Sequence, residues 1–192
     1  MTTLKYLISK LISGNDKVAE ATVEQITAFG ETALPALFGL LDSSNPEERW
    51  WALRVLAVIP HPQVPPRLQQ GLHDPDPIVR QCAALGLSQQ PTVQAIPDLI
   101  SLLEDKDRLL ARLTGDALIT AGSPAVPALV ETLKNGPQAA KIEAARALAL
   151  INDQSAIPAL FKAWQEDSAI VQHWAEEGLD RMGVGMQFFT PE

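Results

Sequence analysis

The sequence predicts an all-α fold, a right-handed α-solenoid of six helical hairpins, from three observations. First, five short apolar clusters carry a proline at the same place, and these prolines are 30 or 31 residues apart: Pro35, Pro66, Pro97, Pro127 and Pro158. Second, a leucine stripe with helical spacing follows each proline, and an alanine-rich helical stretch follows the stripe. Third, the sequence has no alternating apolar run between hairpin turns, the pattern that would indicate β-strands. A period held this closely indicates a stacked array of one supersecondary unit.

The proline clusters predict the first helix of each hairpin. Proline is tolerated in the first turn because the N–H group there has no partner inside the helix. After Pro35, the side chains of Leu37, Leu40 and Leu41 share one helical stripe. We expect these helices to end after about ten residues at polar turns whose Asp, Asn or Ser side chains cap the next helix.

The second helix of each hairpin carries a small residue and, four residues later, a leucine. The pairs are Ala52 and Leu56, Ala83 and Leu87, Thr114 and Leu118, Ala144 and Leu148, and Ala175 and Leu179. A small side chain lets neighbouring helices approach closely, and the leucine fills the space between layers. These pairs therefore predict the buried side of every second helix.

Together the elements predict one domain over residues 1–182, followed by a tail at 183–192. The hairpins are expected at about 2–29, 34–59, 64–88, 95–120, 124–151 and 156–182. The first hairpin has no proline cluster, as is common for an end repeat with one side facing solvent. The tail contains Met186, Phe188 and Phe189, so we expect it to cover the last hairpin or, alternatively, to contact a second copy or a partner.

Composition excludes several classes of function. The chain has 15 Lys and Arg against 23 Asp and Glu, a net charge of −8, which disfavours binding to nucleic acid or to an anionic membrane. No apolar run approaches the length of a membrane-spanning helix, and the segment 1–13 predicts an end helix, not a signal peptide. The single cysteine, Cys82, is consistent with a reducing compartment, so a cytoplasmic location is predicted.

The sequence offers no catalytic or metal-binding set. Its three histidines, His61, His73 and His173, fall in three different hairpins, and the HExxH, CxxC and GxxxxGK[ST] patterns are absent. Cys82 lies next to the small core position Ala83 and far from any predicted base, so we expect a packed, inert thiol. No metal and no cofactor are predicted.

Aromatic and charged residues on the second helices form the candidate binding surface. Trp50, Trp51 and Arg54 share the side of their helix next to the buried stripe, and tryptophan and arginine are enriched in binding hot spots. Repeat alignment places further residues on the same surface, so the full candidate set is Trp50, Trp51, Arg54, Arg112, Asp116, Glu143, Arg146, His173, Trp174 and Glu177. Two alternatives remain open: Trp51 and Trp174 fill gaps between layers, or the charged residues form local ion pairs on a solvated face.

Residues 30–182 resemble HEAT-like repeats of the short bacterial type, the group that includes the phycobilisome-lyase repeats. The resemblance is carried by the A-(I/V/L)-P-A-L clusters and by the run His73-Asp74-Pro75-Asp76-Pro77-Ile78-Val79-Arg80. It implies that an aspartate of this run caps the second helix, that the arginine packs between layers, and that the second helices line the concave face. Arg49 and Arg80 keep that arginine, whereas other residues replace it in the later repeats: Ala111, Lys141 and Gln172.

The favoured hypothesis is a non-catalytic scaffold that binds a protein partner through its concave face, at Trp50, Trp51 and Arg54. The resemblance implies an alternative, a subunit of an E/F-type bilin lyase or a tetrapyrrole-binding chaperone-like protein. In that case Arg54, Arg112 and Arg146 would bind the acidic groups of the bilin. Two other HEAT-type activities are disfavoured: DNA glycosylases by the acidic charge, and di-iron hydroxylases because the sequence has no His-Glu pair.

Overall fold

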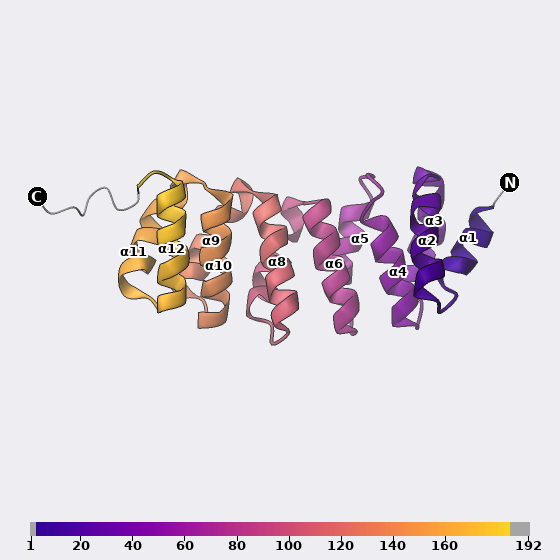
Figure 1. Ribbon diagram of the computed structural model, residues 1–192, viewed down its shortest axis with the longest axis horizontal. Coiled ribbons are helices and arrows are strands. Elements are labelled where there is room, and N and C mark those ends of the chain that lie inside the picture. The colour runs from indigo at the N-terminus through magenta and orange to yellow at the C-terminus, as the bar shows by residue number, and fades with distance from the viewer. Residues whose placement is uncertain (1–2, 185–192) are drawn as a thin grey trace, which may run out of the picture. The chain divides into compact units, whose positions relative to one another are not determined.

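A computed structural model describes residues 3–184, and every regular element within them is helical (Figure 1). The chain divides into two compact units, Met1–Gln90 and Pro91–Glu192, and each is described by itself. Each unit contains three helical hairpins, which confirms the predicted all-α class and the six hairpins. The expectation of a single domain over residues 1–182 stays a prediction.

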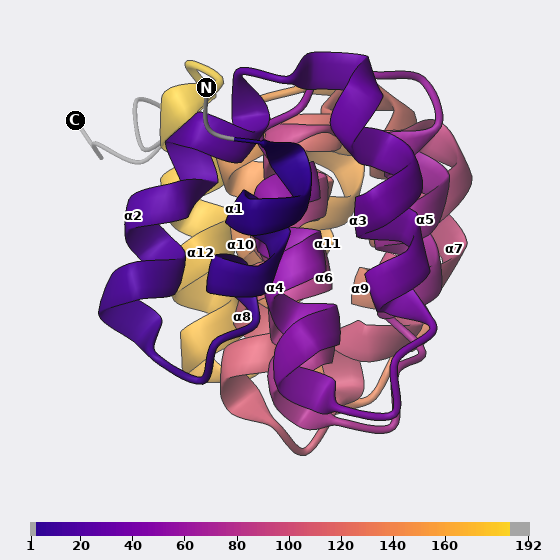
Figure 2. The ribbon, with the colours of Figure 1, turned by 90° about the vertical axis from the view of Figure 1, so that its right-hand side faces the viewer.

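The first unit pairs helix α1 with α2, α3 with α4, and α5 with α6. The helices are α1 (Leu4–Leu11), α2 (Asp16–Thr27), α3 (Leu34–Leu41), α4 (Pro46–Leu56), α5 (Val64–Gly71) and α6 (Pro77–Gln89), with a 3-10 turn, η1 (Gly30–Ala33), before α3. Viewed from its end, this unit places α3 and α5 to one side of α4 and α6 (Figure 2). In these two hairpins the first and second helices therefore form separate layers.

The second unit repeats this pattern with α7 and α8, α9 and α10, and α11 and α12. Its α-helices are α7 (Ile96–Ser101), α8 (Arg108–Ala121), α9 (Val126–Asn135), α10 (Gln138–Ile151), α11 (Ile157–Glu166) and α12 (Ala169–Arg181). Its 3-10 turns are η2 (Val93–Ala95), η3 (Leu102–Glu104), η4 (Ser123–Ala125) and η5 (Gln154–Ala156). The second helices α8, α10 and α12 lie side by side (Figure 1), and α10 packs against both of the others.

Prolines start the first helices as predicted, and the alanines before them have a role that the pattern did not reveal. A proline lies in the first turn of α3, α5, α7, α9 and α11. In four hairpins a 3-10 turn precedes the helix and ends on an alanine that is 0% exposed: Ala33, Ala95, Ala125 and Ala156. The alanine of each cluster is therefore a core residue at the junction of two helix types.

The small position of each second helix lies at the centre of the packing. Ala52, Ala83, Thr114, Ala144 and Ala175 are all 0% exposed. The leucine four residues later is also buried in each of these five hairpins, which confirms the predicted core side. Polar turns cap several second helices as expected: the side chains of Asn45, Asp76 and Asp107 accept backbone N–H bonds at the starts of α4, α6 and α8.

The aromatic part of the tail, with Met186, Phe188 and Phe189, lies outside the described residues. Among residues 3–184, no single helix has the length and apolar character needed to cross a membrane. One bent pair, Arg108–Ala121 with Ser123–Asn135, meets those two criteria on length and composition only.

Candidate functional site

A groove of about 610 Å³ opens on the second helices of the first unit. Its walls come from the N-terminal parts of α2, α4 and α6. The lining residues are Asp16, Glu20, Pro46, Glu47, Trp50, Trp51, Asp76, Ile78 and Val79. The groove thus combines an apolar floor with four carboxylates, and none of the described residues that line it is basic.

Trp50 and Trp51 form the aromatic part of this groove. Their rings meet edge to face, with centroids 4.7 Å apart and planes at 87°. Trp51 is only 4% exposed, whereas Trp50 is partly exposed. The Cys82 thiol on α6 donates a hydrogen bond to the backbone carbonyl of Trp50, with the sulfur 3.6 Å from the oxygen. The neighbouring helix therefore holds this turn of α4 in place.

The four carboxylates differ in how they are held. Glu20 forms an ion pair with Arg54 at 3.0 Å. The Asp76 side chain caps α6 by accepting hydrogen bonds from the backbone N–H groups of Ile78 and Val79. Asp16 and Glu47 lie in the first turns of α2 and α4, and their carboxylates make no hydrogen bond or ion pair within the described residues. Two carboxylates are therefore available to a cationic group from outside.

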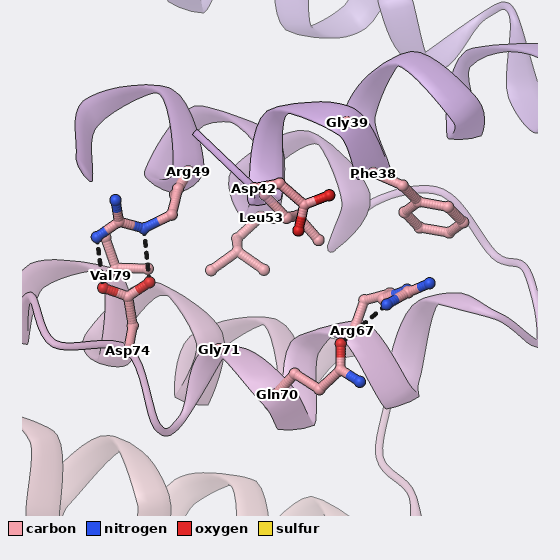
Figure 3. A pocket seen from close by; sticks show the side chains of 11 residues that line it. Phe38, Gly39, Asp42, Arg49, Leu53, Arg67, Gln70, Gly71, Asp74 and Val79 are labelled. Atoms are coloured by element: carbon pink, nitrogen blue, oxygen red, sulfur yellow. Dashed lines mark hydrogen bonds and ion pairs between the residues drawn. The ribbon is translucent and has the colours of Figure 1, made fainter. Parts of the chain in front are cut away.

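A second, smaller cavity of about 240 Å³ lies between the second and third hairpins (Figure 3). At one end, the Arg49 guanidinium binds both carboxylate oxygens of Asp74, each at 2.7 Å. At the other end, the Arg67 guanidinium lies 5.1 Å from the centre of the Phe38 ring, and Leu53 lies between the two ends. This bidentate pair is the packed arginine that the repeat pattern implied.

The pair Arg49–Asp74 is a structural link and not a catalytic one. Burial alone would raise the pKa of Asp74, but the hydrogen bonds from Arg49 and from the Asp76 backbone N–H outweigh it, so that pKa lies below its ordinary value. The hydrogen bond to Asp74 in turn raises the pKa of Arg49. Arg49 also donates to the Ser43 carbonyl at 2.9 Å, so one side chain joins the turn before α4 to the turn before α6.

In the second unit, four predicted residues form one ion-pair network. The Arg146 guanidinium contacts Asp116 of α8 at 2.7 Å and Glu143 of its own helix at 2.8 Å. It also donates to the backbone carbonyl of Arg112 at 3.2 Å. The Arg112 side chain lies 3.8 Å from Asp116. A Cβ atom at Gly115 would lie 2.6 Å from Arg146 Nη2, so this glycine provides the space for the guanidinium.

This network corrects the expectation that Glu143 and Arg146 line an exposed binding surface. Arg146 is 1% exposed and Glu143 is 8% exposed. The physical reason is that the two opposite charges satisfy each other below the surface, with Asp116 as a third member. Trp51 differs from that expectation in the same way, because it packs beneath Trp50.

The last three predicted residues lie on α12 and do not join the others. The rings of His173 and Trp174 are 5.6 Å apart, and Trp174 is half-buried. Glu177 pairs with Arg181 one turn later at 2.7 Å, a local ion pair on the helix surface. The open question about Trp51 and Trp174 therefore has two answers: the first is buried and the second is partly exposed.

Cys82 is packed as expected. Cys82 is buried, and burial raises the pKa of its thiol to about 12 despite the nearby Arg54, so the thiolate is not formed at neutral pH. Among the described residues, no group of three or more His, Cys, Asp or Glu side chains is arranged to hold a metal ion.

Sequence reasoning missed the acidic wall of the groove, namely Asp16, Glu20 and Asp76, and the exposed apolar Ile78. A signal was present, because the starts of successive second helices align in the repeat register at Asp16, Glu47 and Ile78. The tryptophans and arginines that indicate a hot spot lie in the middle of the second helices, whereas the acids lie at their N-terminal ends.

Comparison with known proteins adds the family. A family model described as HEAT repeats matches residues 4–87, 34–119 and 96–180. A phycobilisome maturation protein from Synechococcus elongatus is 39% identical over 106 residues. That alignment covers 55% of this chain and 50% of the relative, so the chain spans about half the length of the curated relative it matches.

Two solved structures illustrate the likeness in fold. The complex of CpcE and CpcF of phycocyanin lyase from a Nostoc species matches with a TM-score of 0.61 and 22% identity, over 75% of this chain and 96% of that chain. A designed armadillo repeat protein in complex with the peptide (KR)4 matches with a TM-score of 0.52 and 18% identity, over 94% and 100%. At these identities the two structures show the α-solenoid fold alone.

Proposed function

Because this chain belongs to the HEAT-repeat family, we propose that it works in phycobilisome maturation as a lyase-like subunit whose protein partner is a phycobilisome polypeptide. The observation that carries the proposal is its 39% identity with a phycobilisome maturation protein. The similar chain of the phycocyanin lyase structure occurs in a complex of CpcE and CpcF, which supports a partner that is itself a protein. The proposal joins the scaffold hypothesis to the lyase-like alternative.

The state of the arginines favours a protein partner over a chromophore as the direct ligand. A tetrapyrrole with acidic side chains needs free cations, and the sequence suggested Arg54, Arg112 and Arg146. Each of them contacts a carboxylate in the structure, and Arg146 is buried as well. A bilin would have to displace those carboxylates, whereas a protein partner can use the aromatic groove as it is.

Capture with defined components tests the proposal. The full chain is immobilised and exposed to dissociated phycobilisomes, with an albumin matrix as control, and retained polypeptides are identified by mass spectrometry. We expect specific retention of one phycobilisome polypeptide. Retention of none would contradict the proposal.

A second arm of the experiment examines the tetrapyrrole alternative. The protein is mixed with a free bilin, and the visible spectrum is recorded. An unchanged absorbance band agrees with a protein-binding role. A shifted band that disappears in the variant Arg112→Met would favour direct chromophore binding.

A further inference from the structure

We propose that the groove of α2, α4 and α6 binds a short segment of a partner protein in which arginine or lysine side chains lie beside leucine-like ones. The inference deepens the proposed function, on which it rests for the identity of the partner as a phycobilisome polypeptide. It depends on three features of the groove: its apolar floor, its unpaired carboxylates, and the contrast with the second unit.

The apolar floor of the groove, formed by Trp50, Trp51, Ile78 and Val79, is partly accessible to solvent. Ile78 is 54% exposed at the start of α6, and Trp50 is partly exposed on α4. Burial of such side chains is favourable by roughly 25 cal/mol per Å² of apolar surface, and tryptophan is the residue most enriched at binding hot spots. The groove therefore favours an apolar side chain from a partner.

The four carboxylates that line the groove determine which charge the partner segment should carry. Asp16 and Glu47 make no ion pair within the described residues, and Glu20 and Asp76 add negative potential beside them. An acidic segment would be repelled, whereas a cationic side chain would gain an ion pair and faster association. Arginine also stacks on aromatic faces, which Trp50 offers at the same site.

The second unit shows that these acids are not a general requirement of the repeat. An acidic residue near a helix N-terminus stabilises the helix dipole, which is a structural reason for Asp16 and Glu47. Yet α8, α10 and α12 form without any acidic residue in the first turn. The combination of acids with exposed apolar side chains is thus a property of this groove.

The size of the groove fits a few side chains and not a whole domain. Its volume of about 610 Å³ falls in the range of about 300–1,000 Å³ that is typical of ligand pockets. A linear segment with two or three inserted side chains matches that volume.

Peptide binding to the full chain tests the inference. The probe is a fluorescein-labelled nonapeptide of alternating arginine and leucine, measured by anisotropy. Two control peptides alternate glutamate with leucine and arginine with serine. We expect the arginine–leucine peptide to bind most tightly and to weaken as salt is raised, because exposed charges are screened. If the glutamate–leucine peptide bound as tightly as the arginine–leucine peptide, the proposed role of the groove carboxylates would be overturned.

Variants locate the binding. Trp50→Ala should weaken the arginine–leucine peptide by about thirtyfold, the size expected for a hot-spot residue. Removal of both free charges in Asp16→Asn/Glu47→Gln should weaken it by about fourfold to twenty-fivefold, because the free energies of two exposed ion pairs add. Glu104→Lys, an exposed change in the second unit, is the matched control and should have no effect. Ile78→Ala is a second apolar variant in case Trp50→Ala unfolds, which thermal denaturation would reveal.

The outcomes separate this inference from the proposed function. If phycobilisome polypeptides are retained equally by the wild type and by Ile78→Ala and Trp50→Ala, the groove proposal fails and the proposed function stands. If the peptide binds as expected but no phycobilisome polypeptide is retained, the proposed function fails. If Trp50→Ala instead converts a dimer to a monomer in sedimentation, a second copy occupies the groove and the proposal is overturned.

Discussion

Each unit has an arginine on a second helix that pairs with a carboxylate on the preceding second helix, but the two arginines differ in burial. In the first, Arg54 of α4 reaches back to Glu20 of α2 at 3.0 Å; in the second, Arg146 of α10 reaches back to Asp116 of α8 at 2.7 Å. Both pairs join neighbouring second helices, and the two arginines occupy equivalent repeat positions, whereas the acids do not: Glu20 lies 34 residues from its arginine and Asp116 lies 30. Yet the Arg54 side chain is 31% exposed, whereas that of Arg146 is 1% exposed.

The residue three positions before each arginine explains the difference. In the first unit it is Trp51, which packs with Trp50 and leaves Arg54 at the surface. In the second unit it is Glu143, which binds Arg146 from its own helix while Gly115 on α8 leaves room for the guanidinium. The residue at this repeat position, together with Gly115 on the neighbouring helix, therefore distinguishes the buried charge network from the aromatic groove.

The largest expected effect is from Arg146→Met. Loss of the guanidinium leaves Glu143 buried without its partner. Breaking a buried ion pair in this way lowers the free energy of unfolding by about 3–5 kcal/mol. Chemical denaturation measures this cost. The double change Glu143→Leu/Arg146→Met is the control and should recover much of the stability, because no charge is then left buried. A cost under about 1 kcal/mol for the single variant, as for exposed pairs, would contradict the buried network.

Gly115→Ala comes next. The new Cβ would lie 2.6 Å from Arg146 Nη2 and 3.2 Å from Glu143 Oε2. Because Asp116 and Glu143 hold the guanidinium, we expect the overpacking cost of about 1–3 kcal/mol. A double-mutant cycle with Arg146→Met measures the coupling: the cost should largely vanish once the guanidinium is absent. Additive costs would mean that the glycine acts on some other contact.

A second pair of equivalent links compares arginine with lysine. Arg49 binds Asp74 through two nitrogens, whereas Lys141 binds Asp167 through one, at 3.1 Å. We expect Asp74→Asn to cost about 1.5–3 kcal/mol, as for hydrogen bonds to charged groups. Asp167→Asn should cost less. Urea unfolding of the two variants gives the comparison, and a larger cost at Asp167 would reverse it.

The same links predict how stability depends on pH. Burial acts to raise the pKa of both carboxyls, but their hydrogen bonds hold each pKa below the ordinary value. The unfolded chain then binds protons more readily than the folded one, so the contribution is present above the unfolded pKa of about 3.9 and is lost as pH falls through the folded pKa. Unfolding free energy should therefore decline below about pH 4, and Asp74→Asn should flatten that decline.

The repeat architecture could be predicted from the sequence because proline and alanine act locally. Pro35 and its equivalents fix a helix start wherever they occur, and Ala52 and its equivalents are buried by close helix contact. The exposure of Trp51 and Arg146 could not be predicted in this way, because both lie at the edge of the buried stripe. At an edge position the neighbouring side chains decide burial: for Trp51 the neighbour is Trp50, and for Arg146 they include Gly115 and Asp116, which lie 31 and 30 positions away on α8.

The smallest effect on stability is expected from Arg54→Met, and it gives the sharpest functional test. Its exposed ion pair should contribute under about 1 kcal/mol, so unfolding free energy should change little. Loss of the arginine frees Glu20 at the groove, however, and adds a third unpaired carboxylate. We therefore expect the arginine–leucine peptide to bind about twofold to fivefold more tightly, from one more exposed ion pair. Weaker binding would instead make Arg54 a direct contact of the partner, as the sequence pattern first indicated, and would place the cation in the wall of the groove and not in its ligand.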